Sequence, residues 1–107
     1  MGSRKGWLAF STRPVGTIII DEGASKAILE KGKSLLPSGI LQVECSFQRG
    51  EVVDIQHNSE TIARGIVNYS SGNIEQIVGR HSREIDSILG PGHDQEVIHK
   101  DNLSLLK

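Results

Sequence analysis

Apolar residues recur along the chain first with the spacing of a strand and then with the spacing of a helix. Gly16–Ile20 is a continuous, mostly β-branched segment, which is typical of a buried strand. The apolar residues from Ala24 to Ile28 then fall on one helical face. Asp21 can cap the start of this helix and Gly32 favours its end. The pattern therefore predicts a buried strand followed by a short helix.

The rest of the chain predicts further strands and two more short helices. Strands are expected at residues 40–44, 51–57, 61–69, 96–99 and 102–106. Helices are expected around residues 74–78 and 85–89, and Ser82 is the expected N-cap of the second. Gly65 lies in mid-strand, which indicates a bulge or a close approach of another backbone. The order β-α-β-β-β-α-α-β-β, mainly strands, predicts a small mixed α+β domain on a compact barrel-like sheet.

The length and composition predict one folded domain. The chain has 107 residues, of which 29 are Ile, Leu or Val, enough for one core without disulfides or a structural metal. Residues 1–15 mix Gly, Ser, Thr and Pro, and we expect them to be a tag remnant and interdomain lead-in. The folded domain is expected at residues 16–107.

Charge and cysteine content narrow the function classes. The formal charge is −1, which is not the footprint of a strong nucleic-acid binder. Residues 1–50 hold seven Lys or Arg against four Asp or Glu (net +3), and residues 51–107 hold five against nine (net −4). Cys45 is the only cysteine, which excludes an internal disulfide and a multi-thiolate zinc site. We expect a cytoplasmic protein, because no apolar run approaches the length of a membrane helix.

The tripeptide Gly32-Lys33-Ser34 resembles the end of a phosphate-binding loop. The full motif needs a glycine where Ala27 stands, and it follows a strand, whereas this tripeptide follows a helix. A helix C-cap followed by a loop is therefore the better interpretation. The loop still suits a phosphate group, because it combines backbone amides and the Ser34 hydroxyl with Lys31 and Lys33.

Neither a metal site nor a base-stacking surface is expected. His93 and His99 lie near acidic residues, but their spacing matches no zinc pattern, and we expect surface histidines. The chain has four aromatic residues, and Phe47 is expected in the core. Nucleic acid, if bound, would be contacted through phosphates and shape rather than through stacking.

Five segments of the chain carry a family resemblance. They are Lys31–Ile40, Phe47–Val53, Ala63–Ser71, Gly79–Ile85 with Ile88–Gly90, and Glu96–Leu103. The first three resemble a PUA domain, the fold named for pseudouridine synthases and archaeosine transglycosylases. The last two narrow the resemblance to the C-terminal PUA domains of bacterial glutamate 5-kinases (γ-glutamyl kinases). Departures are small: Cys45-Ser46 stands where the family tends to have Gly-Asp, and Phe10 where Gly is usual.

The resemblance implies a PUA-like mixed-sheet pseudo-barrel decorated by short helices. It also implies a parent enzyme that uses ATP and Mg²⁺ to phosphorylate L-glutamate in the first step of proline biosynthesis. That chemistry needs a kinase domain N-terminal to Arg4, which this chain lacks, so we expect no catalytic, cofactor or metal residues here. The implied partners are the kinase domain of the same polypeptide and further copies in a homo-oligomer, with no membrane.

Two roles remain open for such a domain. The near-neutral charge favours a regulatory and interaction domain, whereas the basic loop favours an RNA-binding module. In PUA domains that bind RNA, the contact surface consists of the loop between the first helix and second strand together with the last strand. The resemblance carries this surface to Lys31, Gly32, Lys33, Ser34 and Gly39, with Lys100 and Asn102 as additions.

Overall fold

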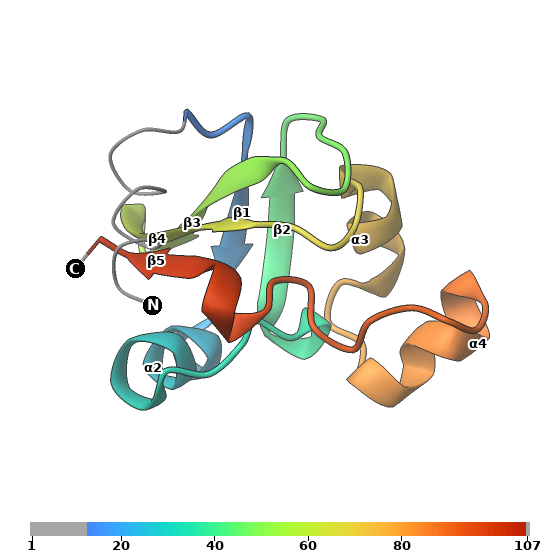
Figure 1. Ribbon diagram of the computed structural model, residues 1–107. Helices are drawn as coiled ribbons and strands as arrows, with labels where there is room; N and C mark the ends of the chain where they lie inside the picture. Colours follow the sequence, from blue (N-terminus) through green and yellow to red (C-terminus); the bar gives the residue numbers. More distant parts are fainter. Residues whose placement is uncertain (1–12, 107) are drawn as a thin grey trace.

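Residues 13–106 are described by the computed structural model, and they form a mixed five-stranded sheet with short helices (Figure 1). The strands are β1 (Gly16–Ile20), β2 (Ile40–Glu44), β3 (Val52–His57), β4 (Glu60–Ile66) and β5 (Leu103–Leu105), in the spatial order β2-β1-β3-β4-β5. Neighbouring strands run antiparallel except for β1 and β3, which are parallel. The expected fold class is confirmed. The lead-in expected at residues 1–15 falls, up to residue 12, outside the described residues.

Within residues 13–106, three α-helices and three 3₁₀ turns surround the sheet. The helices are α2 (Glu22–Lys31), α3 (Ser71–Ile77) and α4 (Ile85–Leu89), and the turns are η1 (Pro37–Gly39), η2 (Ser82–Glu84) and η3 (Lys100–Asn102). Figure 1 shows α2 at the lower end of the sheet, while α3 and α4 lie together on the opposite side of the molecule. No helix among residues 13–106 is long and apolar enough to cross a bilayer.

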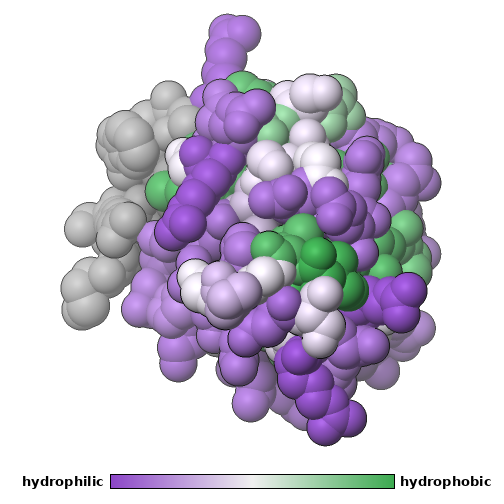
Figure 2. All heavy atoms as spheres, turned by 90° about the vertical axis from the view of Figure 1, so that its right-hand side faces the viewer, coloured by the Kyte–Doolittle hydropathy of each residue, from purple (hydrophilic) through white to green (hydrophobic). Residues whose placement is uncertain are grey.

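The core lies between the sheet and the helices. Alternate residues of β1 are buried, and Ile28 of α2, Ile74 of α3 and Ile85 of α4 pack into the same cluster. Phe47 is buried there too, as expected from the sequence. On the α3–α4 side, Figure 2 shows a mainly polar surface that surrounds a compact apolar patch. Each strand and helix thus contributes one apolar face to a single core, and its opposite face can carry polar groups.

Helix α2 begins and ends where the sequence predicts. The Oδ1 atom of Asp21 accepts the N–H of Ala24 at 2.8 Å, which satisfies one of the amides that a helix start leaves unpaired. Gly32 ends the helix in the left-handed conformation (φ 62°), where a side chain would be strained. The ends of α2 therefore follow directly from these two residues.

Two tight turns use left-handed residues that are not glycine. Asn58 and Ser59 have φ values of 54° and 65° between β3 and β4, as in a two-residue hairpin turn. Cys45 has φ 70° directly after β2. Glycine adopts this conformation without strain, so the position suits glycine better than cysteine.

Two sequence expectations are wrong in the last third of the chain. Ser82 does not cap α4: the side chain of His81 accepts the N–H of Arg83, and the Ser82 hydroxyl donates to the Gln95 carbonyl instead. Residues 96–99 do not form a strand and make only an isolated bridge, between Ile98 and Leu35. The segment pairs with the loop after α2 only at Leu35, so it does not extend into the ladder of paired residues that makes a strand.

Gly65 of β4 lies against the backbone of η3, which confirms the predicted close approach. A Cβ atom at this position would lie 2.8 Å from the carbonyl oxygen of Asn102 and 2.9 Å from Cγ2 of Ile98. Both distances are shorter than van der Waals contact allows. Glycine is therefore the residue that lets β5 and the turn before it pack on β4.

We expect Gly65→Ala to lower the free energy of unfolding by about 1–3 kcal/mol, because the added methyl group must displace backbone. Gly72→Ala is the matched control, since Gly72 lies in α3 with nothing within 4 Å of its Cβ position. That variant should be neutral or up to about 1 kcal/mol more stable. Urea unfolding of both variants checks this, and equal effects would contradict it.

Tyr69 connects the segment after α4 to the core. Its ring is buried, its hydroxyl donates to the carbonyl of Asp94, and it stacks on His93 with ring centroids 5.8 Å apart. Arg49 also reaches Asp94, at 3.5 Å. Burial, and next the Asp94 carboxylate, raise the pKa of Tyr69 from 10.0 to about 12. The phenol proton is thus held more tightly in the folded chain than in the unfolded one.

This shift predicts alkaline destabilisation with a definite sign. From its ordinary pKa of 10.0 up to about 12, the unfolded chain releases the Tyr69 proton while the folded chain keeps it, so stability falls as the pH rises. Tyr69→Phe should lose about 1 kcal/mol at neutral pH, through the missing hydrogen bond, and should lack this alkaline fall. Urea midpoints between pH 8 and pH 11.5 check it. Parallel pH curves for both proteins would contradict it.

Candidate functional site

A groove of about 780 Å³ opens beside α2. Its walls come from three parts of the chain: the face of α2, the loop that follows α2, and the segment before η3. The lining residues are Asp21, Gly23, Ala24, Ala27, Lys31, Gly32, Lys33, Ser34, Leu36, Ser38, Gly39, Glu96, His99 and Lys100. Six of the seven residues predicted to contact phosphate lie in this lining. The structure thus brings together residues that are more than 60 positions apart.

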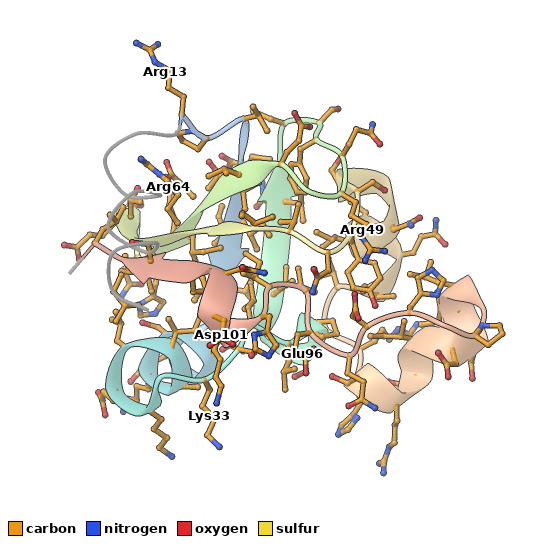
Figure 3. The ribbon with its side chains drawn as sticks, viewed as in Figure 1. Arg13, Lys33, Arg49, Arg64, Glu96 and Asp101 are labelled. Atoms are coloured by element: carbon orange, nitrogen blue, oxygen red, sulfur yellow. The ribbon has the colours of Figure 1, made fainter. Side chains whose placement is uncertain are left out.

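The end of α2 places two lysines at one end of the groove. The amides of Gly32 and Lys33 both donate to the carbonyl of Ala27, which turns the chain away from the helix axis. These amides are therefore used within the chain and are not the phosphate donors that the sequence suggested. Lys31 and Lys33 are exposed, and Figure 3 shows Lys33 pointing away from the body of the molecule. The loop therefore offers a ligand the ammonium groups of Lys31 and Lys33.

A hydrogen bond joins the two walls of the groove. The amide of Lys100 donates to the hydroxyl oxygen of Ser34 at 2.8 Å, across 66 positions of sequence. The neighbouring residue Leu35 pairs with Ile98: the Leu35 amide donates to the Ile98 carbonyl at 2.9 Å, and the Leu35 carbonyl accepts the amide of Val97 at 2.8 Å. Among residues 13–106, no hydrogen bond uses the Ser34 hydroxyl as donor, so its proton remains available to a ligand. The lysine loop and Lys100 are thereby held at one site.

The groove is of mixed charge. Lys31, Lys33 and Lys100 are balanced in part by Asp21 and Glu96, which leaves a net charge of +1 when His99 is neutral. Glu96 comes from the segment before η3 and Lys33 from the loop after α2 (Figure 3). Such a groove can pair with a surface that carries both signs, or with an anion placed at its lysine end.

Gly39 and Asn102, two of the residues predicted to contact phosphate, take part in the packing of the fold. A Cβ atom on Gly39 would lie 2.5 Å from the Cβ of Ala24, so this glycine is needed for α2 to pack on η1. Asn102 is not part of the groove lining, and its carbonyl lies against Gly65. The structure gives both residues a role inside the fold.

His93 and His99 make structural contacts. His93 stacks on Tyr69 and its Nδ1 atom lies 2.9 Å from the Gly90 carbonyl, whereas the Nδ1 atom of His99 accepts the amide of Asp101. Within the described range, no three His, Cys, Asp or Glu side chains gather as a metal site would require. Sequence reasoning missed His99, Glu96 and Asp21 as groove residues, because only the fold brings them beside the loop.

Comparison with known proteins agrees with this architecture. The sequence profile of the PUA domain matches residues 16–89, which is more than half of the chain. The chain belongs to the PUA domain family. Two solved PUA domain structures share its fold. One, from Aeropyrum pernix K1 in complex with tartrate, has a TM-score of 0.57 and 25% identity, and covers 79% of this chain and 41% of its own. The other, from Thermoplasma acidophilum, has a TM-score of 0.52 and 20% identity, and the match covers 87% of this chain and 53% of that structure's chain.

This PUA domain is also similar to part of the glutamate 5-kinases. It is 47% identical to the enzyme of Thermoanaerobacter sp. strain X514 over 108 residues, which cover 100% of this chain and 29% of the enzyme. It is 48% identical to the enzyme of Trichlorobacter lovleyi over 107 residues, which cover 99% of this chain and 28% of the enzyme. The matching part is the C-terminal part of these kinases. The chain therefore spans less than a third of the relatives' length.

The packing of Gly39 predicts that a substitution there acts through the fold. We expect Gly39→Val to lower the free energy of unfolding by about 1–3 kcal/mol, because its side chain must displace Ala24. Lys33→Ala, at an exposed position of the same groove, should stay within about 0.5 kcal/mol of the unmodified chain. Urea unfolding distinguishes the two. Equal stabilities would show that α2 can move away from η1 at little cost.

Proposed function

We propose that this PUA domain is the non-catalytic regulatory and interaction module of an ATP-dependent glutamate 5-kinase. The supporting observation is the 47% identity with these kinases, which extends over the whole chain and is not limited to a motif. The activity of the parent enzyme, transfer of the γ-phosphoryl group of ATP to L-glutamate, would reside in the kinase domain. The role of this chain would be to contact that domain and to tune its inhibition by proline.

The groove is the surface that best suits such a contact. Its walls are fixed by the Ser34–Lys100 hydrogen bond and the Leu35–Ile98 bridge, so it presents a defined shape before any partner binds. Its mixed charge favours a protein surface of both signs, since complementary charges set register and specificity more than affinity.

A chimeric kinase tests this proposal. The C-terminal part of the Thermoanaerobacter enzyme that matches this chain is replaced by it. We expect the chimera to keep kinase turnover and inhibition by proline. In the chimera, Lys33→Glu and Lys100→Glu should each shift the proline concentration for half-inhibition by about two- to fivefold, the effect of losing one surface ion pair.

Lys26→Glu is the matched control for charge reversal. Lys26 is an exposed lysine of α2 that lies outside the groove and pairs with Glu22 at 3.3 Å. This variant should leave the inhibition curve unchanged. The same shift in all three variants, or in none, would count against the groove as the regulatory surface.

RNA binding is the second candidate function. It is favoured by one observation, that Lys31, Lys33, Lys100 and the Ser34 hydroxyl gather at one groove. These groups would contact phosphates, which position an RNA without reading its sequence. The net charge of −1 for the whole chain argues for a modest affinity.

If RNA binds, the affinity should fall steeply with salt, because phosphate contacts release counterions. Lys33→Ala should weaken binding of different sequences about equally and reduce the slope of log affinity against log salt by about one. Lys26→Ala should leave the slope unchanged. Filter binding of short single-stranded RNAs at two salt concentrations measures both. Equal slopes for Lys33→Ala and the unmodified chain would exclude the groove as the RNA surface.

A further inference from the structure

The turn that forms one wall of the groove begins with an imidazole cap. The Nδ1 atom of His99 accepts the amide of Asp101 at 3.1 Å, at the start of η3. An imidazole nitrogen accepts a hydrogen bond only when it carries no proton, and a protonated ring carries one on each nitrogen. This cap therefore exists only while His99 is neutral with its proton on Nε2.

Turn η3 is connected to both the groove and the sheet. Its first residue, Lys100, donates its amide to Ser34 of the facing wall, and its last, Asn102, lies against Gly65 of β4. Leu103 follows at once as the first residue of β5. A change at the start of η3 is thus placed to alter the groove wall.

The charged groups around His99 are of both signs. The Asp101 carboxylate lies 3.6 Å from Nδ1, on the same turn, and Lys100 is the next residue. The other charged groups that line the groove are Glu96 on the same segment and Asp21, Lys31 and Lys33 on α2 and its loop. The ring is 41% exposed, so solvent protons reach it. A protonated ring has a new partner at hand in the Asp101 carboxylate.

We propose that His99 is a proton-sensitive cap that regulates the groove. When the ring gains a proton, Nδ1–H donates to the Asp101 carboxylate, the Asp101 amide loses its acceptor, and the start of η3 loosens. The same proton changes the net charge of the groove lining from +1 to +2. Acidification that protonates the ring would therefore favour anions in the groove. Only this last consequence rests on the groove being the binding surface proposed above.

The other histidines with assigned bonds provide internal comparisons. His81 caps η2 in the same manner, with Nδ1 accepting the amide of Arg83 at 3.3 Å, but it does not line the groove. His93 has the opposite requirement, because its Nδ1 faces the Gly90 carbonyl and must carry the proton. Protonation should release the cap at His81 and preserve the bond at His93.

The first test uses nuclear magnetic resonance on the unmodified chain. Nitrogen shifts at pH 7.5 should show the Nε2–H tautomer for His99 and the Nδ1–H tautomer for His93. Between pH 7.5 and pH 5, protection of the Asp101 amide from hydrogen exchange should fall by about fivefold, as expected from loss of a cap. An Nδ1–H tautomer for His99, or constant protection of Asp101, would overturn the proposal.

Two asparagine variants show which histidine causes the change in protection of the Asp101 amide. His99→Asn keeps a side-chain oxygen that can cap the turn but does not titrate, so protection of Asp101 should become independent of pH. His81→Asn should keep the Asp101 transition and lose the corresponding one at Arg83. An Asp101 transition that survives in His99→Asn would contradict the proposal.

Binding of oligouridylate tests the charge effect, because its phosphodiesters and bases do not titrate between pH 5.5 and pH 7.5. The unmodified chain and His81→Asn should bind about three- to tenfold more tightly at pH 5.5, and His99→Asn should show no such gain. The same gain in His99→Asn would overturn the charge effect. Absence of binding at both pH values would remove RNA as the ligand, and the amide data would still decide on the cap.

Discussion

The loop after α2 and the segment before β5 are held side by side by the Leu35–Ile98 bridge and by the bond from the Lys100 amide to the Ser34 hydroxyl. Everything on the groove side of the molecule depends on this contact. It turns a helix end and a 3₁₀ turn into two facing walls. Because the two segments are about 65 positions apart, the groove exists only once the chain has closed around its core.

Local chemistry made much of the fold predictable. Asp21 and Gly32 mark the ends of α2 because a carboxylate acceptor and a left-handed glycine act within a few residues. The sequence predicted that another backbone lies close to Gly65, but it did not identify Asn102 as that neighbour. The lysine loop could be predicted as one wall of the groove, but its facing wall could not. His99 and Glu96 reach the groove only through pairing between distant segments, which no local pattern contains.

The errors at the C-terminal end have one physical cause. Ser82 is a better N-cap than histidine by residue preference, yet its hydroxyl is bonded to Gln95, and His81 takes the capping position. At residues 97–98, the segment meets the loop after α2 in one isolated bridge to Leu35, so the local strand pattern does not extend into a ladder. In both places, packing against the rest of the molecule outweighs local propensity.

The contact between Gly39 and Ala24 has a consequence for how the groove recognises a partner. The helix lies so close to η1 that there is no space for even one methyl group, and α2 cannot tilt inward on binding. The backbone of the groove is therefore preorganised, and association costs little conformational entropy there. The entropy that is lost belongs mainly to the lysine side chains, which are rotamer-rich when exposed. Selectivity should thus come from a fixed shape, and adaptability from the lysines at its rim.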